Sequence, residues 1–196
     1  MAHELAAPSA WVRRFAPMIA AGGRVLDLAC GSGRHALLLA ELGFRVLALD
    51  RDAAALKRVV EAMAEKRRSG ASITGLVDVT QADVESGPWP FGDAQFDAVV
   101  VTNYLHRPLM PAIAASLGPG GVLIYETFGI GNERHGRPAN PEFLLARDEL
   151  LECFRPRLTV VAFEQGLVAV PALAVVQRLC AVKTGDFASI PLLLAT

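Results

Sequence analysis

The sequence predicts an α/β fold, a mostly parallel sheet with helices on both faces. Apolar runs of strand length alternate with segments of helical periodicity, a pattern typical of parallel strands joined by right-handed crossovers. The stretch Val25–Gly33 adds a second indication, because an apolar run leads into a glycine turn and then a helical pattern. The chain has 196 residues, 53% hydrophobic and 20% charged. We therefore expect a single domain over residues 1–196 with one substantial core.

Caps, glycines and apolar spacing define the elements of the amino-terminal half. Ser9 can cap a helix on which Trp11, Phe15 and Ile19 recur at helical spacing, within an amino-terminal helical segment over residues 1–22. The expected elements are a helix from Ser9 to Gly22-Gly23, a strand ending near Leu28, a helix over 33–42, a strand over 45–49, a helix capped by Asp52 and ending near Gly70, and a strand over Ile73–Val77.

The carboxyl-terminal half is predicted in the same way. Phe96–Thr102 is a nearly continuous apolar run, which indicates a strand buried on both faces. Residues 118–121 (Gly-Pro-Gly-Gly) predict a turn, and residues 128–146 predict an inserted loop because they carry little apolar periodicity. The remaining expected elements are helices over Pro108–Leu117 and Arg147–Phe154 and strands over Val122–Thr127, Leu158–Glu164 and Ala174–Lys183.

Composition excludes several classes of function. A net charge of −1 gives no electrostatic footprint for a phosphate backbone, which disfavours nucleic acid as a partner. The cysteines Cys30, Cys153 and Cys180 are too far apart to suggest a disulfide framework or a metal site. Glu4 lies where a signal peptide would be apolar, and no apolar run is long enough to span a bilayer. We expect a cytoplasmic protein without a metal, whose oligomeric state the sequence leaves open.

The glycine turn predicts a site for an adenosine-containing cofactor. Gly31 and Gly33 remove side chains where a ligand must approach the backbone. Asp50 ends the next expected strand, where a carboxylate can accept hydrogen bonds from a ribose. The residues from Gly31 to Ala36 also satisfy the dinucleotide fingerprint G-x-G-x-x-G/A, so a nicotinamide oxidoreductase is one interpretation.

Three features favour a different cofactor. Asp27 lies four residues before Gly31, where a carboxylate suits an ammonium group better than a pyrophosphate. The chain leaves little room for the separate substrate domain of most nicotinamide enzymes. Residues 81–83 (Gln-Ala-Asp) follow the third expected strand and could hydrogen-bond an adenine amino group.

The set formed by residues 25–33 (VLDLACGSG), Asp50, residues 81–83 (QAD) and residues 96–103 (FDAVVVTN) resembles the class I S-adenosylmethionine-dependent methyltransferases. It is most similar to the small bacterial methyltransferases of the tellurite-resistance type. The resemblance implies a Rossmann-like fold with a seven-stranded sheet of order 3-2-1-4-5-7-6, in which the last two strands form an antiparallel hairpin at one edge. It also implies S-adenosylmethionine as the cofactor and S-adenosylhomocysteine as the product.

The resemblance assigns roles to particular residues. Asp27 would face the methionine ammonium, Asp50 both ribose hydroxyls, and Asp83 with the Val84 backbone the adenine. The alternative for the three acids is a turn or cap role. The implied cofactor contacts are Asp27, Ala29, Gly31, Gly33, Asp50, Arg51, Asp83, Val84 and Asn103. His35, one turn beyond Gly31, could contact a ligand or be an exposed residue at the start of a helix.

Candidates for the acceptor side follow the fourth expected strand and the fifth. Tyr104 could line a methyl channel, and His106 could act as a base or orient the acceptor, although His106 could also support the next helix. The loop over 128–146 is a candidate substrate lid. The polar residues predicted to bind the acceptor there are Glu126, Asn132, His135 and Arg137. The alternative is that these side chains form hydrogen bonds within the loop.

The function predicted from these patterns is methyl transfer from S-adenosylmethionine to an unidentified small-molecule acceptor. A non-catalytic module that binds the cofactor would carry the same glycine turn, so it is the main alternative.

Overall fold

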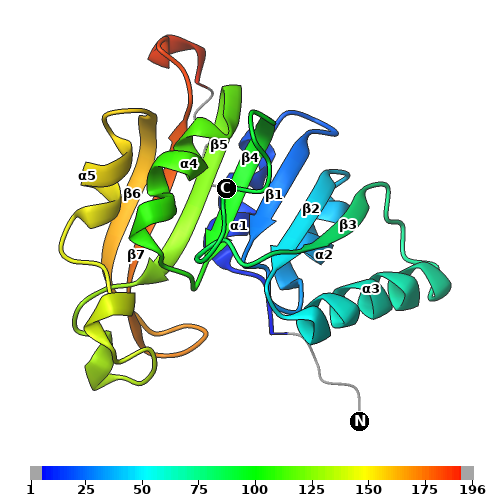
Figure 1. Ribbon diagram of the computed structural model, residues 1–196, viewed down its shortest axis with the longest axis horizontal. Helices are drawn as coiled ribbons and strands as arrows, with labels where there is room; N and C mark the ends of the chain where they lie inside the picture. The colour runs from blue at the N-terminus through cyan, green and yellow to red at the C-terminus, as the bar shows by residue number, and fades with distance from the viewer. Residues whose placement is uncertain (1–5, 191–196) are drawn as a thin grey trace.

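The computed structural model describes residues 6–190 and contains one seven-stranded sheet of order β3-β2-β1-β4-β5-β7-β6 (Figure 1). Strands β1 to β5 are parallel, whereas β7 pairs antiparallel with β5 and β6. The predicted fold class and strand order are confirmed. The strands are β1 (Arg24–Leu28), β2 (Arg45–Asp50), β3 (Leu76–Gln81), β4 (Phe96–Thr102), β5 (Leu117–Phe128), β6 (Thr159–Val168) and β7 (Ala174–Val182).

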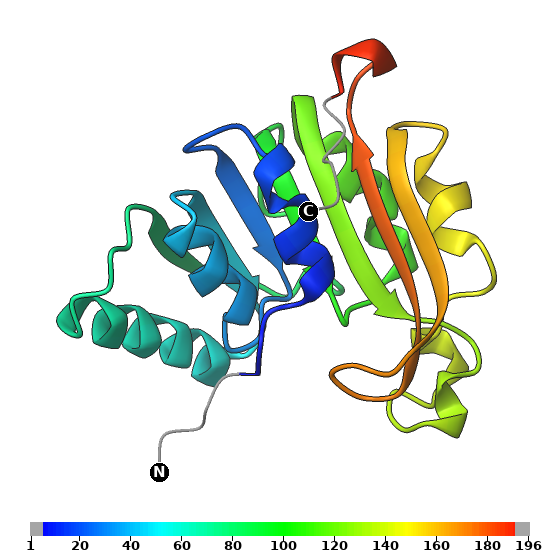
Figure 2. The same cartoon turned by 180° about the vertical axis from the view of Figure 1, so that it is seen from behind.

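Helices cover both faces of the sheet. Two opposite views show α1, α2 and α3 on one face and α4 and α5 on the other (Figures 1 and 2). The α-helices are α1 (Ala10–Phe15), α2 (Arg34–Glu41), α3 (Ala53–Arg68), α4 (Met110–Ala115) and α5 (Glu149–Phe154). Short 3-10 turns lie at η1 (Ala16–Met18), η2 (Arg107–Leu109), η3 (Asn132–Arg134), η4 (Pro141–Phe143) and η5 (Phe187–Ser189).

Two apolar layers enclose the sheet, and neighbouring residues of a central strand enter opposite layers. In β1, Val25 packs with α1 and α2, while Leu26 packs with α4 and α5, and both side chains are fully buried. This burial on both faces explains the continuous apolar runs of β1 and β4. The strand order reverses between β1 and β4, so the carboxyl ends of β1, β2, β4 and β5 meet at one edge of the sheet.

Two predicted boundaries differ because glycines serve packing or pairing rather than turns. The third strand is Leu76–Gln81 instead of Ile73–Val77, because the chain first passes tightly against α2 at Gly75. A Cβ there would lie 2.6 Å from the Ala40 carbonyl oxygen. As an edge strand, β3 accommodates the exposed Asp78 on its uncovered side.

The predicted turn at residues 118–121 is part of β5. Gly120 N–H donates to the Lys183 carbonyl at 2.8 Å, and Lys183 N–H donates to the Gly121 carbonyl at 2.9 Å. These bonds continue the pairing with β7, and Leu117 pairs with Phe96 of β4, so the strand begins at Leu117 rather than Val122. Helix α5 begins at Glu149 rather than Arg147.

The caps predicted for α1 and α3 are present. The Ser9 hydroxyl accepts from Trp11 N–H at 3.0 Å, and the Asp52 carboxylate accepts from Ala54 N–H at 2.8 Å. Within residues 6–190, no helix has the length and apolar character needed to cross a membrane. Glu4, on which the expectation about the amino terminus depended, lies outside the described residues.

Gly33 owes its lack of a side chain to helix packing. It has a φ of +80°, and a Cβ there would lie 2.7 Å from a methyl group of the buried Val59 on α3. The close approach of α2 to α3 therefore requires glycine at this position. Packing thus requires glycine here independently of the cofactor approach predicted for Gly33.

We expect Gly33→Ala to lower the free energy of unfolding by about 2–4 kcal/mol, because it adds left-handed strain to overpacking against Val59. Gly22→Ala is the matched control, since Gly22 has a φ of +67° but no atom within 4 Å of an added Cβ. Its cost should be only about 1 kcal/mol. Urea unfolding measures both, and equal losses would contradict the packing explanation.

Candidate functional site

A cavity of about 340 Å³ lies at the carboxyl edge of the sheet. Its position matches the place where parallel α/β sheets bind ligands, beyond the strand ends at the reversal of strand order. Residues from the ends of β1, β2, β3, β4 and β5 contribute to it. The lining residues are Ala29, Leu49, Asp50, Arg51, Ala82, Asp83, Val84, Glu85, Asn103, Tyr104, Leu105, Thr127, Phe128, Pro138 and Phe143.

Asp50 connects the first two strand ends of this edge. One carboxylate oxygen accepts from Gly31 N–H at 2.7 Å, and the other accepts from Asp52 N–H at 2.9 Å. The carboxylate is only partly buried and lines the cavity, so its remaining lone pairs are available to a ligand. Two hydroxyl donors from one ligand could bind there.

The turn after β1 has left-handed backbone at two positions that face the cavity edge. Ala29 has a φ of +54° and Gly31 a φ of +55°, and nothing lies within 4 Å of a Cβ added at Gly31. Cys30 N–H between them donates to the Leu49 carbonyl at 2.9 Å, which continues the pairing of β1 with β2. The free space at Gly31 leaves its backbone open to a ligand.

Asp27 lies beneath this turn and is only 1% exposed. One of its carboxylate oxygens is buried without a hydrogen-bond partner among the described residues. Burial raises the pKa of Asp27 to about 7, and the Ala36 backbone and the Arg34 charge oppose that rise. A buried carboxylate with an unpaired oxygen is suited to a cationic partner.

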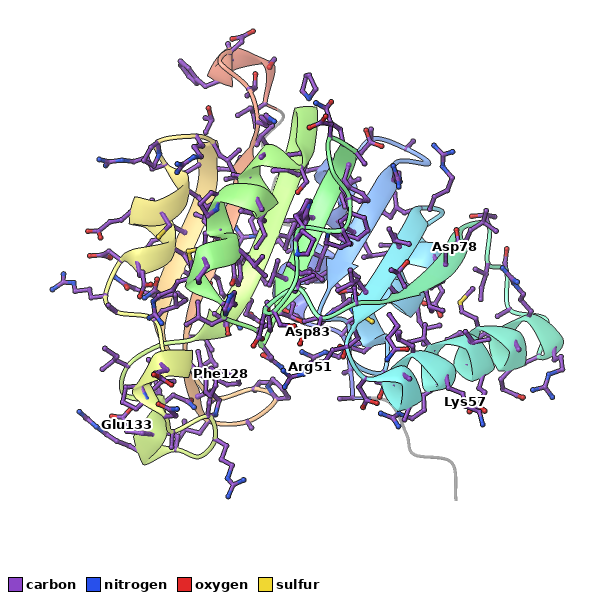
Figure 3. All side chains as sticks on the ribbon, in the orientation of Figure 1. Arg51, Lys57, Asp78, Asp83, Phe128 and Glu133 are labelled. Carbon is purple, nitrogen blue, oxygen red and sulfur yellow. The ribbon has the colours of Figure 1, made fainter. Side chains whose placement is uncertain are left out.

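The segment after β3 closes the cavity on the β2 side. The Asp83 carboxylate accepts from Glu85 N–H at 3.0 Å and from the Ser86 hydroxyl at 2.8 Å, and these bonds lower the pKa of Asp83. They hold the loop so that Val84 lies at the cavity surface. Figure 3 shows Arg51 and Asp83 close together at this edge, with Phe128 on the β5 side.

Asn103 and Tyr104 line the cavity from the end of β4. Asn103 has a left-handed φ of +55°, and its N–H donates to the Glu126 carbonyl at 2.9 Å. The Tyr104 hydroxyl is buried without a hydrogen-bond partner in the described part of the chain. Burial and the nearby carboxylates of Glu85 and Asp83 raise the pKa of Tyr104 above its usual value. Tyr104 therefore faces the β3 side of the cavity.

A methyltransferase-domain family profile matches residues 25–121. This range runs from β1 into β5 and contains the glycine turn, Asp50, Asp83 and Asn103. Residues 25–121 thus match a methyltransferase domain. The sheet order and its antiparallel edge are those that the resemblance to the class I S-adenosylmethionine-dependent methyltransferases implies.

Individual methyltransferases share limited sequence with the chain. Protein-L-isoaspartate O-methyltransferase of Chlorobaculum tepidum is 34% identical over 116 residues, which cover 57% of this chain and 48% of that protein. The chain thus matches about half the length of this curated relative.

Solved structures share the fold, and two of them illustrate the likeness. TehB from Haemophilus influenzae superposes with a TM-score of 0.74 at 18% sequence identity. The superposition covers 92% of this chain and 64% of TehB. The glycopeptide N-methyltransferase MtfA, solved with S-adenosylhomocysteine, gives a TM-score of 0.64 at 20% identity over 91% of this chain and 90% of MtfA.

Seven of the nine residues predicted to contact the cofactor in this methyltransferase domain lie at or beside the cavity. Six line it directly: Ala29, Asp50, Arg51, Asp83, Val84 and Asn103. Gly31 is joined to Asp50 by a hydrogen bond. The other two do not line it: Asp27 is buried beneath the glycine turn, and Gly33, at the end of that turn, packs against α3.

The structure does not bring the four residues predicted to bind the acceptor to the cavity. Glu126 points to the opposite side of β5 and pairs with Arg178, which also lies 3.5 Å from Glu164. His135 and Arg137 are exposed and do not line the cavity. Glu126 faces away because side chains alternate along a strand, so its neighbour Thr127 faces the cavity instead.

Asn132 agrees with the alternative expectation, in which the polar side chains form hydrogen bonds within the loop. Its amide N–H donates to the Pro138 carbonyl at 3.0 Å, and its amide oxygen accepts from Val175 N–H at 3.2 Å. The first bond of this buried side chain therefore lies within the loop, and the second holds the loop against β7. The loop reaches the cavity through Pro138 and Phe143 rather than through the predicted polar residues.

His106 also lies away from the cavity lining. It is partly buried and precedes η2, and its side chain makes no cap hydrogen bond there. Of the two predicted catalytic residues, only Tyr104 lines the cavity.

Arg107 is a structural residue of the site that sequence reasoning missed. Its guanidinium forms two bonds to the Glu149 carboxylate, at 2.6 and 3.0 Å. It also donates to the carbonyls of Glu142 at 2.8 Å and Leu144 at 2.9 Å. These four bonds hold the segment that carries Phe143 against the end of β4. The partners lie 35–42 residues further along the chain, so local sequence gave no signal.

We expect Arg107→Lys to loosen residues 141–145, because an ammonium cannot reproduce the planar two-bond contact with Glu149. Amide hydrogen exchange of this segment should rise at least fivefold, while thermal unfolding shifts by only about 2–4 °C. Arg147→Lys is the control, because Arg147 is 87% exposed and forms one ion pair, with Asp148. Unchanged exchange in Arg107→Lys would refute this role.

Proposed function

We propose that the chain binds S-adenosylmethionine in the cavity and catalyses transfer of its methyl group to a small-molecule acceptor. The observation that carries the proposal is the carboxylate of Asp50, which lines the cavity while it holds the Gly31 turn. When bound, the cofactor supplies a methyl group activated by a sulfonium. The match of residues 25–121 to a methyltransferase domain supports this activity, since the fold alone would fit a module that only binds the cofactor.

The cavity offers one set of contacts for each part of the cofactor. Asp50 would accept the ribose hydroxyls, and Val84 and Asp83 would flank the adenine. Because the Tyr104 hydroxyl lies near Glu85 and Asp83, we assign Tyr104 to the adenine end rather than to a methyl channel. The unpaired oxygen of Asp27 fits the methionine ammonium.

The acceptor would lie at the β5 end of the cavity. Thr127, Phe128, Pro138 and Phe143 line this end, and the two aromatic rings offer an apolar surface for a small organic body. These residues contribute by aligning the acceptor with the methyl group, which can supply several kcal/mol of the barrier reduction. We propose that residues 128–146 form this side of the site, as part of a single domain.

Cofactor binding tests the proposal directly. Calorimetry with S-adenosylhomocysteine should show binding by the wild-type chain and at least a tenfold weaker affinity for Asp50→Asn, because the loss of a charge-assisted hydrogen bond costs about 1.5–3 kcal/mol. The matched control is Asp97→Asn. Asp97 also accepts a backbone N–H at 2.7 Å, from Arg24, but at the opposite edge of the sheet.

Failure of the wild-type chain to bind S-adenosylhomocysteine would overturn the proposal. Binding without transfer of a radiolabelled methyl group to any small molecule of a cell extract would favour the non-catalytic module. Equal losses in Asp50→Asn and Asp97→Asn would place the ligand elsewhere.

The affinity for S-adenosylhomocysteine should depend on pH through Asp27. Its pKa of about 7 in the free protein means that the carboxyl is largely protonated below pH 7. Pairing with an ammonium requires the ionised form, so the affinity should fall as pH falls, approaching tenfold per pH unit below pH 6. Calorimetry at pH 7, 6 and 5 measures this slope. Asp27→Asn should bind more weakly and without the slope; an identical slope in both proteins would exclude Asp27 as its source.

A further inference from the structure

His35 joins three separate parts of the chain beside the glycine turn. It is the second residue of α2 and is only 1% exposed. Its Nε2 accepts from Ser9 N–H at 3.0 Å, and its Nδ1 lies 3.1 Å from the Thr102 hydroxyl. Since Nε2 is an acceptor, the ring proton resides on Nδ1 and is donated to Thr102. One neutral imidazole therefore connects the segment before α1, the start of α2 and the end of β4.

The segment before α1 approaches the proposed cofactor site at this point. It runs along the carboxyl edge of the sheet before α1 begins (Figures 1 and 2). Arg34, which directly follows Gly33, donates to the Ala7 carbonyl at 3.4 Å. Thr102 immediately precedes Asn103, a residue of the cavity lining. Thr102 is thus next in the chain to a cavity residue, and Ser9 lies two residues from Ala7, which is bonded to the residue after the glycine turn.

Helix α1 does not need His35 for its own attachment. Trp11 and Phe15 are buried in the core, and the Trp11 indole N–H donates to the Leu179 carbonyl at 3.3 Å. The bond from Ser9 N–H to His35 instead determines where residues 6–9 lie. This bond therefore stabilises the position of the segment at the edge of the sheet rather than the packing of the core.

We propose that His35 is a positioning residue that holds residues 6–9 against the carboxyl edge, so that this segment supports the glycine turn of the cofactor site from behind. This inference rests on the proposed function. His35 would act by positioning Ser9 and Thr102, and it would not contact the reacting groups itself. The hydrogen bond to Ser9 is the part of the arrangement that matters for ligand affinity.

Two conservative variants separate the two hydrogen bonds of His35. In His35→Asn the side-chain amide can replace Nδ1 toward Thr102 but is too short to reach Ser9. In His35→Gln the longer side chain can place its amide oxygen near the position of Nε2 and accept from Ser9 N–H. Calorimetry with S-adenosylhomocysteine should show at least a fivefold weaker affinity for His35→Asn and an affinity within twofold of wild type for His35→Gln.

A second pair of variants tests the same bond from the other partner. Ser9 has a φ of −55°, which proline adopts without strain. Ser9→Pro removes the backbone N–H and the hydroxyl cap, while Ser9→Ala removes only the cap. The affinity should fall at least fivefold in Ser9→Pro relative to Ser9→Ala, whereas the cap loss common to both lowers the stability of α1.

Thermal unfolding of each variant shows whether it is folded, and the Ser9 pair decides the question if His35→Asn does not fold. Equal affinities in Ser9→Ala and Ser9→Pro would overturn the inference. Equal losses in His35→Asn and His35→Gln would do the same, because they would reflect a general structural role. If the wild-type chain binds no S-adenosylhomocysteine, the proposed function itself fails; if it binds and the variants match it, only this inference fails.

Discussion

The arrangement of the site depends on one carboxylate that holds backbone from two neighbouring strands. Asp50 accepts N–H groups from Gly31 and Asp52, so it fixes the turn after β1 and the start of the segment leading to α3. Charge-assisted bonds of this kind are stronger than neutral ones. They also leave the carboxylate at the cavity surface, where a ligand can use it. The same interaction therefore fixes two strand ends and leaves a carboxylate at the proposed cofactor site.

The remaining features keep this edge of the sheet in place. Gly33 allows α2 to pack closely on α3, which determines where the turn before α2 lies. His35 connects that helix to β4 and to the segment before α1. On the other side of the cavity, Arg107 holds the segment that carries Phe143. Each contact links parts of the chain that are distant in sequence, and together they position one cavity.

Most of the helices and strands could be predicted from sequence because their signals are local, whereas the strand order and most candidate cofactor residues were implied by the family resemblance. Strand length, glycine turns and the caps at Ser9 and Asp52 depend on neighbouring residues. The acceptor side depends on long-range partners, which a single sequence does not reveal. Asn132 was predicted to bind a ligand, yet its amide holds Val175 and Pro138. Conversely, the structural role of Arg107 was not predicted, because its hydrogen-bond partners lie far along the chain.

The most direct test of the central claim is an NMR titration of the amide N–H groups with S-adenosylhomocysteine. If Asp50 anchors the ligand, the largest shifts will occur at Gly31, Asp52 and Asn103 and along residues 82–85, all of which lie at or beside the cavity. Shifts confined to the groove between residues 129–130 and 165–166, on the β6 side of the sheet, would contradict the account.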